Sequence, residues 1–167
     1  MPGRPTCLGR PLAWRPPVEA HGSRVPLMTE IPDSLRELLA TGPLATVVTL
    51  DPDGTPHVTL SWAGFDDDEI VMATFLFLEQ RKLQNVRRDP RVTLVFQAKE
   101  YSGPGLWPYA VVQCRVDRIT EGGALDVMDR LAEYYIGPGQ RYPMRDMPEG
   151  VVWHLTVDRI YGQGPWA

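Results

Sequence analysis

Short apolar runs rich in β-branched residues, separated by turn-forming residues, constrain the fold of this chain more than any other feature. The first two runs, Leu44–Leu50 and Pro56–Phe65, flank the turn sequence Asp-Pro-Asp-Gly at residues 51–54, which predicts a hairpin. No strand-to-helix alternation with a G-x-G-x-x-G motif occurs, which argues against a dinucleotide-binding α/β fold. The sequence therefore predicts a mainly β protein, an antiparallel barrel of five or six strands with short flanking helices. Further strands are expected at residues 70–77, 91–96, 109–119 and 151–161.

Helical periodicity appears in three places between these runs. Leu35, Leu38 and Leu39 form an apolar stripe ahead of the first strand, and a longer stripe runs through residues 122–135. The third helix is the basic segment described below. Two connections, 97–108 and 136–150, are rich in Gly and Pro and longer than hairpins need, which is typical of functional loops.

Composition narrows the classes of protein and partner. The chain has 167 residues and a net charge of −4, which suits one core and does not favour a nucleic-acid partner. No apolar run reaches the length of a membrane span. The two cysteines have no metal-ligand spacing, and Cys114 alternates with Val112 and Val116 as a small buried residue would. We therefore expect a cytoplasmic protein with no metal site, no nucleic acid and no membrane partner.

The first 27 residues differ from the rest of the chain. They contain six prolines and scattered arginines but no apolar periodicity, and no apolar core follows the arginines as in a secretory signal. We interpret residues 1–27 as a disordered leader or a mis-assigned start, with Met28 as the natural start. Residues 28–167 are then the functional domain.

The stretch Glu79–Arg91 carries the strongest functional signal, since five of the 17 Lys and Arg residues lie in it. Leu83 and Val86 give it one apolar side at helical spacing, and Asp89-Pro90 ends the helix. Lys82 then lies in the first turn of a short helix entered from a strand end. Free backbone N–H groups and the helix dipole favour an anion there, which predicts a phosphorylated ligand. A solvated basic helix face is the alternative.

These residues and several others resemble those of a known family. The chain is similar to the split-barrel flavin and deazaflavin oxidoreductases, the FMN-binding, pyridoxamine 5′-phosphate oxidase-like group, and within it to the mycobacterial-type branch that uses coenzyme F420. The similarity covers about residues 30–165. The matching stretches are Leu44-Ala45-Thr46 with Asp53-Gly54-Thr55-Pro56-His57, then Lys82-Leu83-Gln84-Asn85-Val86-Arg87-Arg88-Asp89-Pro90-Arg91, Trp107-Pro108-Tyr109-Ala110 and Ile160-Tyr161-Gly162.

The resemblance implies a cofactor site at the interface of a homodimer. Lys82 would bind the cofactor phosphate with Gln80 beside it, and Thr74 would hydrogen-bond the cofactor. Trp107 and Tyr109 would reach the cofactor of the partner subunit. His57 matches a position beside the cofactor, although it can equally be an ordinary strand residue. The remaining residues that the resemblance places at the site are Val58, Thr59, Leu60, Ser61 and Trp62 along the ring system, and Asn85 in the helix.

One departure from the family pattern bears on the choice of cofactor. The branch usually has Arg where this chain has Gln80, so the phosphate site loses about one charge-assisted hydrogen bond, ~1.5–3 kcal/mol. A phosphodiester with one charge tolerates that loss better than the monoester of FMN does. The absence of an arginine at position 80 therefore favours F420, whose phosphate is a diester, with FMN as the alternative.

Three functions remain open at this stage. The resemblance implies an F420-dependent oxidoreductase that transfers a hydride between the deazaflavin and an unsaturated small molecule, with no side chain required as acid or base. The second is an FMN-dependent flavoprotein of the pyridoxamine-phosphate-oxidase type. The third is a carrier that holds a deazaflavin, flavin or haem-like ligand without turnover. The catalytic residues and the substrate are not defined by the sequence.

Overall fold

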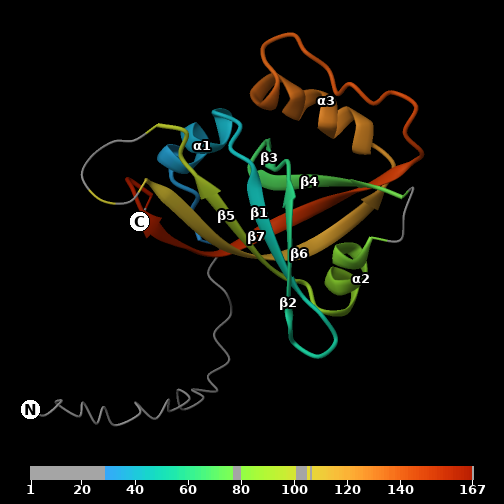
Figure 1. Cartoon of the computed structure of the whole chain (residues 1–167), viewed down its shortest axis with the longest axis horizontal. Coiled ribbons are helices and arrows are strands. Elements are labelled where there is room, and N and C mark those ends of the chain that lie inside the picture. Colours follow the sequence, from blue (N-terminus) through green and yellow to red (C-terminus); the bar gives the residue numbers. More distant parts are fainter. Residues whose placement is uncertain (1–28, 77–79, 101–104, 106, 167) are drawn as a thin grey trace, which may run out of the picture.

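The computed structural model describes residues 29–76, 80–100, 105 and 107–166 as one sheet of seven strands with three short helices (Figure 1). Every strand pairing in the sheet is antiparallel, which confirms the predicted class. Residues 1–27, which we interpret as a leader, lie outside the described residues. In chain order the elements are α1 (Asp33–Ala40), β1 (Ala45–Leu50), β2 (Pro56–Ser61), β3 (Gly64–Asp66), β4 (Glu69–Phe75), α2 (Arg81–Arg88), β5 (Arg91–Gln97), β6 (Tyr109–Glu121), α3 (Ala124–Tyr135) and β7 (Gly150–Gln163).

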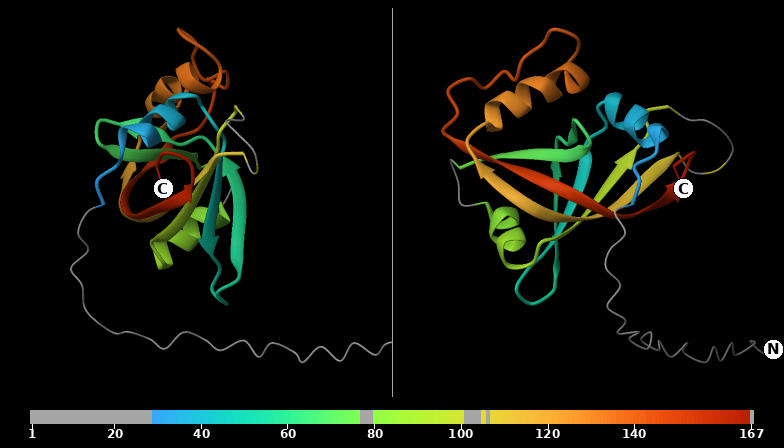
Figure 2. Two further views of the ribbon diagram at one scale, coloured as in Figure 1. Left: turned by 90° about the vertical axis from the view of Figure 1, so that its left-hand side faces the viewer. Right: turned by 180° about the vertical axis from the view of Figure 1, so that it is seen from behind.

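The strand order explains why the sheet is a split barrel. The strands follow one another as β2-β1-β5-β6-β7-β4-β3, so β2 and the β3–β4 hairpin form the two edges. The long, bulged pairing of β6 with β7 lets the sheet curl strongly. Figure 2 shows α3 and α2 on opposite sides of β4. The split lies between these two edges, where α2 contacts β1 and α3 contacts the edge strand β3 through the Arg130–Asp66 pair at 2.8 Å.

The hairpin between β1 and β2 forms where the turn sequence predicted it. Asp51 N–H donates to Thr55 O and Gly54 N–H donates to Asp51 O, both at 2.9 Å. Gly54 has φ +82°, a conformation that L residues rarely adopt. Register follows from the turn, with Val48 opposite Val58 and Thr46 opposite Leu60.

The prediction of a single strand over residues 56–65 is wrong. The chain leaves β2 after Ser61 and enters β3 at Gly64, on the opposite edge of the sheet. The Tyr135 hydroxyl holds the crossing, because it accepts from Ala63 N–H at 3.0 Å and lies 2.8 Å from Pro43 O as a donor. Apolar pattern alone does not reveal this break, because apolar residues continue across it at Leu60, Trp62, Ala63 and Phe65. The strand count is therefore seven and not five or six.

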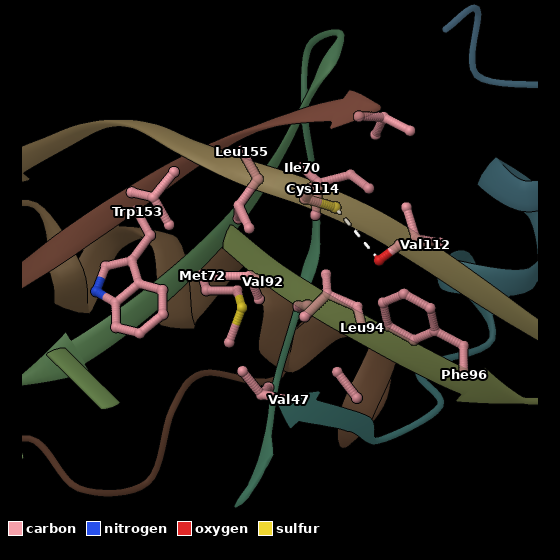
Figure 3. Close-up of a cluster of buried hydrophobic side chains, with 14 of the residues drawn as sticks. Val47, Ile70, Met72, Val92, Leu94, Phe96, Val112, Cys114, Trp153 and Leu155 are labelled. Atoms are coloured by element: carbon pink, nitrogen blue, oxygen red, sulfur yellow. Dashed lines mark hydrogen bonds between the residues drawn. The ribbon is translucent and has the colours of Figure 1, made fainter. Parts of the chain in front are cut away.

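Two hydrophobic clusters stabilise the domain. The inner cluster fills the barrel with side chains of β1, β4, β5, β6, β7, α1 and α2 (Figure 3). Cys114 belongs to it, its Sγ 3.6 Å from Val112 O, and burial raises the pKa of its thiol to about 12. The outer cluster packs α3 against the other face of β4 and β7, through Val71, Ala73 and Leu131 among others. The outer cluster thus forms a second layer on the outside of the barrel.

Candidate functional site

Helix α2 has the form that the sequence predicted. It begins at Arg81, so Lys82 lies in its first turn, and it ends at Arg88 before the Asp89-Pro90 pair. Leu83 and Val86 are buried in the inner cluster. Gln80, the residue before the helix, donates from Nε2 to Phe75 O at 3.2 Å and so ties the helix start to the end of β4.

Lys82 points toward the barrel and not into solvent. Its Nζ lies 5.9 Å from the centre of the Trp153 ring, within cation–π range. Burial lowers the pKa of the Lys82 ammonium, and among the described residues no carboxylate forms an ion pair with it. A half-buried cation without a counter-ion is costly to keep charged. An anionic ligand would supply the missing charge.

The neighbouring Arg81 is already engaged. It forms a bidentate pair with Asp51, from Nε at 2.7 Å and from Nη2 at 2.6 Å. The Asn85 amide donates to Asp51 Oδ1 at 2.9 Å and to Thr49 Oγ1 at 3.1 Å. The hydrogen bond from Asn85 and then the contacts with Arg81 hold the pKa of the Asp51 carboxyl below its usual range. This network fixes α2 against the β1–β2 hairpin, and it uses both N–H donors of the Asn85 amide.

The arginines at the end of α2 do not reinforce Lys82. Arg88 donates to Leu50 O and to Asn85 Oδ1, and Arg87 is exposed. Arg91 pairs with Asp89 at 2.6 Å, and its guanidinium lowers the pKa of that carboxyl to about 2. Among the described residues of this basic segment, Lys82 is therefore the cation directed at the barrel.

Three buried polar atoms have no hydrogen-bond partner among the described residues: Thr59 Oγ1, Thr74 Oγ1 and Trp153 Nε1. Thr74 is 2% exposed and Trp153 0% exposed. Buried polar groups are nearly always hydrogen-bonded, and each unpaired group costs ~1–3 kcal/mol. Unpaired donors that gather in one place therefore indicate the position of a ligand.

The strand register places these atoms around the split. Thr59 lies on edge strand β2 opposite Val47, whose side chain is in the inner cluster. Thr74 follows Met72 on the inner face of β4, and Met72 pairs with Trp153 on β7. Lys82 reaches the same ring from α2. Two threonine side chains, an indole ring and an ammonium group therefore all lie on the inner side of the barrel.

The predicted cofactor strand is the edge strand β2, and its two faces differ. His57, Thr59 and Ser61 are half-buried and point inward, whereas Val58 and Leu60 are exposed on the outer face. An edge strand leaves backbone N–H and C=O groups unpaired on one side. Inward side chains and a free backbone edge can therefore both face a planar ring that lies in the split.

Two groups of predicted residues lie elsewhere in the chain. Trp62 belongs to the outer cluster, where it stacks on Tyr135 with ring centres 4.7 Å apart. Trp107 and Tyr109 lie at the start of β6, at the end of the sheet that carries the C-terminus and far from α2 (Figure 1). Within one chain, the structure therefore brings together Lys82, Gln80, Thr74, Asn85 and the inner face of β2, but not Trp107 and Tyr109.

Sequence reasoning missed Trp153 and the Arg81–Asp51 pair. Trp153 occupies a core position in the last strand, and no local motif marks its N–H as unpaired. Asp51 reads as an ordinary turn residue before Pro52. Both features depend on contacts over long sequence separations, so only the folded chain reveals them.

The described residues contain neither a metal-binding cluster nor a helix that could span a membrane. Within the described ranges no group of three or more His, Cys, Asp and Glu side chains could hold a metal ion. No helix in the described part of the chain is long and apolar enough to cross a lipid bilayer.

Comparisons with known proteins identify the family from the sequence and support the fold from solved structures. The sequence model of the family described as pyridoxamine 5′-phosphate oxidase matches residues 31–164. No curated protein matches the chain. Among solved structures, an F420 reductase superposes with TM-score 0.62 and 21% identity, covering 78% of this chain and 98% of that one. A conserved hypothetical protein, Rv2991 from Mycobacterium tuberculosis, gives 0.57 and 24%, covering 81% and 87%.

A third similar structure has another kind of role. HutZ, the haem storage protein from Vibrio cholerae, superposes with TM-score 0.54 and 14% identity, covering 81% of this chain and 96% of that one. At these identities the structural likenesses show the fold alone. The family match spans most of the chain, so the chain belongs to the pyridoxamine 5′-phosphate oxidase family and has its split-barrel fold.

Proposed function

We propose that this member of the family is an oxidoreductase that uses the deazaflavin coenzyme F420 to transfer a hydride to or from an unsaturated small molecule. The observation that carries the proposal is the half-buried Lys82 next to the Trp153 ring, together with three buried polar atoms, all without a partner among the described residues. This is the donor set expected for a phosphorylated planar cofactor. The similar fold of an F420 reductase supports the choice of deazaflavin.

The charge of the site favours a phosphodiester over a phosphomonoester. Gln80 is neutral and donates to Phe75 O, and Arg81 is held by Asp51. Among the described residues of the basic segment, Lys82 is then the cation that can face the phosphate, which matches the single negative charge of a diester. The monoester of FMN is close to doubly charged and would keep one charge without a cation.

The side chains of this chain then have distinct tasks. Lys82 and the start of α2 hold the phosphate, and Thr59 and Thr74 supply hydroxyls that lack partners without a ligand. The edge of β2 orients the ring, and the inner cluster keeps water away from its buried side. When bound, the deazaflavin supplies the hydride chemistry, so the protein contributes position and shielding.

The outer face of the sheet supports a homodimer. Leu44, Val58 and Leu60 are 51%, 56% and 63% exposed, and they lie beside the half-buried Val48 and Val95. Soluble monomers rarely expose contiguous apolar patches of this kind. In a C2 dimer a second copy would cover the patch.

The dimer would also give Trp107 and Tyr109 a place at a site. They lie at the end of the sheet away from Lys82 in their own chain. Light scattering should report a dimer at micromolar concentration, and Leu60→Lys should shift the protein to a monomer. A wild-type monomer that binds cofactor normally would contradict the dimer and leave the single-chain site intact.

Titration of the purified full-length chain with F420, FMN and FAD tests the cofactor. We expect tightest binding of F420, followed by hydride exchange between reduced F420 and an added acceptor, measured by F420 fluorescence. Tighter binding of FMN than of F420 would identify FMN as the cofactor. Binding of a cofactor or of haem without hydride exchange, across a panel of acceptors, would instead indicate a carrier.

A gain-of-charge variant tests the electrostatic argument separately. Gln80→Arg places a second cation next to Lys82, so FMN affinity should rise about tenfold or more relative to F420. Gln84→Arg is the matched control, since it adds the same charge at an exposed position of the same helix. An equal gain from both variants would show that net charge, and not the position next to Lys82, governs the preference.

A further inference from the structure

The indole N–H of Trp153 is a hydrogen-bond donor for which the family resemblance gives no role. Trp153 is fully buried, and its Nε1 has no partner among the described residues. Figure 3 shows the ring at one end of the inner cluster, with its nitrogen directed away from the other labelled side chains. Buried tryptophans usually find a partner for this N–H. A ring that served packing alone would be better replaced by an apolar one.

The surroundings of this N–H point to an anion. Lys82 Nζ lies 5.9 Å from the centre of the same ring. Lys82 belongs to the first turn of α2, where the backbone N–H groups of an eight-residue helix face outward from its start. Thr74, two residues from the partner of Trp153 on β4, carries a second unpaired donor and is 2% exposed. One cation and two neutral donors therefore lie on residues that surround the Trp153 ring.

We propose that Trp153 is the second donor to the phosphate group that Lys82 binds, at a site whose single available cation favours singly charged phosphodiesters. The inference rests on the proposed function, because it assigns a further residue to the same cofactor site. A neutral N–H strengthens binding of a phosphate oxygen without adding positive charge. The second charge of a monoester dianion would remain unneutralised, since Arg81 is committed to Asp51.

Indole resonances give a direct readout on the wild-type protein. The chain has five tryptophans, so a ¹⁵N-labelled sample shows a small set of indole N–H signals. We expect F420, and diethyl phosphate at higher concentration, to shift the Trp153 signal downfield, as for an N–H that gains a charged acceptor. Phenyl phosphate, a monoester, should shift it less at the same concentration and pH 8.

Substitution measures the contribution of the N–H. Trp153→Phe keeps an aromatic ring and removes the donor, so F420 affinity should fall about tenfold, as for one hydrogen bond to a charged group. Met72→Leu is the matched control, because Met72 pairs with Trp153 and the change alters packing without removing a donor. Its affinity should stay within about twofold. Should Trp153→Phe not fold, single Phe substitutions of the other tryptophans assign the signal by elimination.

The outcomes separate this inference from the proposed function. If F420 binds while the Trp153 signal stays unmoved, the inference is overturned and the cofactor assignment stands. If F420 does not bind but diethyl phosphate shifts the signal, the anion site stands and the cofactor assignment fails. If the signal responds to neither ligand, or if Met72→Leu weakens binding as much as Trp153→Phe, the donor role is overturned.

Discussion

The two hydrophobic clusters on either side of β4 differ in whether their polar groups are hydrogen-bonded. In the outer cluster the Tyr135 hydroxyl has Pro43 O and Ala63 O within 2.8 and 3.0 Å and accepts from Ala63 N–H. In the inner cluster and at its edge, Thr59, Thr74 and Trp153 each have a buried polar atom without a partner in the described part of the chain. Hydrogen-bonded polar groups at the outer cluster therefore stabilise the fold, whereas unpaired polar groups at the split lower its stability.

The outer cluster also fastens the connection between α3 and β7. Tyr142 N–H donates to Asp129 Oδ1 at 2.9 Å, and Arg145 donates to the same oxygen at 2.5 Å. The Tyr142 ring packs against Trp62 and Phe75, with ring centres 5.5 and 5.6 Å apart. The long loop predicted over residues 136–150 is thus anchored onto the domain. Its contacts resemble those of a core and not those of an open binding loop.

The largest expected effect on cofactor affinity is that of Lys82→Ala, at the split. Loss of a charged hydrogen bond to phosphate should weaken F420 binding about ten- to a hundredfold, measured by fluorescence titration. The thermal midpoint should not fall, because a half-buried cation without a partner is removed. Arg87→Ala removes the same charge from the exposed side of α2 and should change affinity little. Equal losses from both variants would mean that Lys82 acts only through net charge.

Tyr135→Phe should have the reverse profile. It removes one hydroxyl and leaves Ala63 N–H without its partner, so the free energy of unfolding should fall by ~1–3 kcal/mol. Affinity for F420 should remain within about twofold, because the ring and its stacking on Trp62 persist. Urea unfolding and cofactor titration of the same sample check both parts. A large loss of affinity would connect the outer cluster to the site.

Thr74→Val should separate stability from binding at the split. The substitution replaces a buried unpaired hydroxyl by a methyl group of similar shape, so the free protein should gain up to ~1 kcal/mol of stability. Binding of F420 should weaken about fivefold, since a donor is lost. The equivalent test at a satisfied group, Thr49→Val, should cost stability instead because Asn85 loses an acceptor. Destabilisation by Thr74→Val would show that its hydroxyl is satisfied in solution.

The smallest effect concerns pH. Burial lowers the pKa of Lys82 from its ordinary 10.5, and an anion binds the protonated form. Affinity for F420 should therefore fall as the pH rises, and the fall should begin at a lower pH than for an ordinary lysine, because free Lys82 loses its proton more readily. Lys82→Arg keeps its charge throughout this window and should abolish the alkaline loss. An identical alkaline loss in Lys82→Arg would assign it to another group.

Several features of the fold and of the candidate site are predictable from the sequence alone. The β-branched runs, the Asp-Pro-Asp-Gly turn and the K-x-x-N-x-R-R-D-P-R stretch sufficed for the antiparallel class, the first hairpin and helix α2. They placed Lys82 correctly at the helix start, because Leu83, Val86 and the Asp89-Pro90 pair fix the face and the end of that helix. Local periodicity and turn chemistry depend on only a few neighbouring residues, so the elements that they define can be predicted from the sequence.

Other features were decided only by tertiary structure. Arg81 and Lys82 are adjacent cations in the sequence, yet one is paired with Asp51 and the other faces Trp153. The crossing at Ala63 depends on Tyr135, 72 residues further along the chain. Which polar atoms remain unpaired depends on the complete set of neighbours in the folded chain. The sequence by itself therefore determined the family, the fold class and the position of one cation, while the tertiary structure decided which groups stayed free to bind.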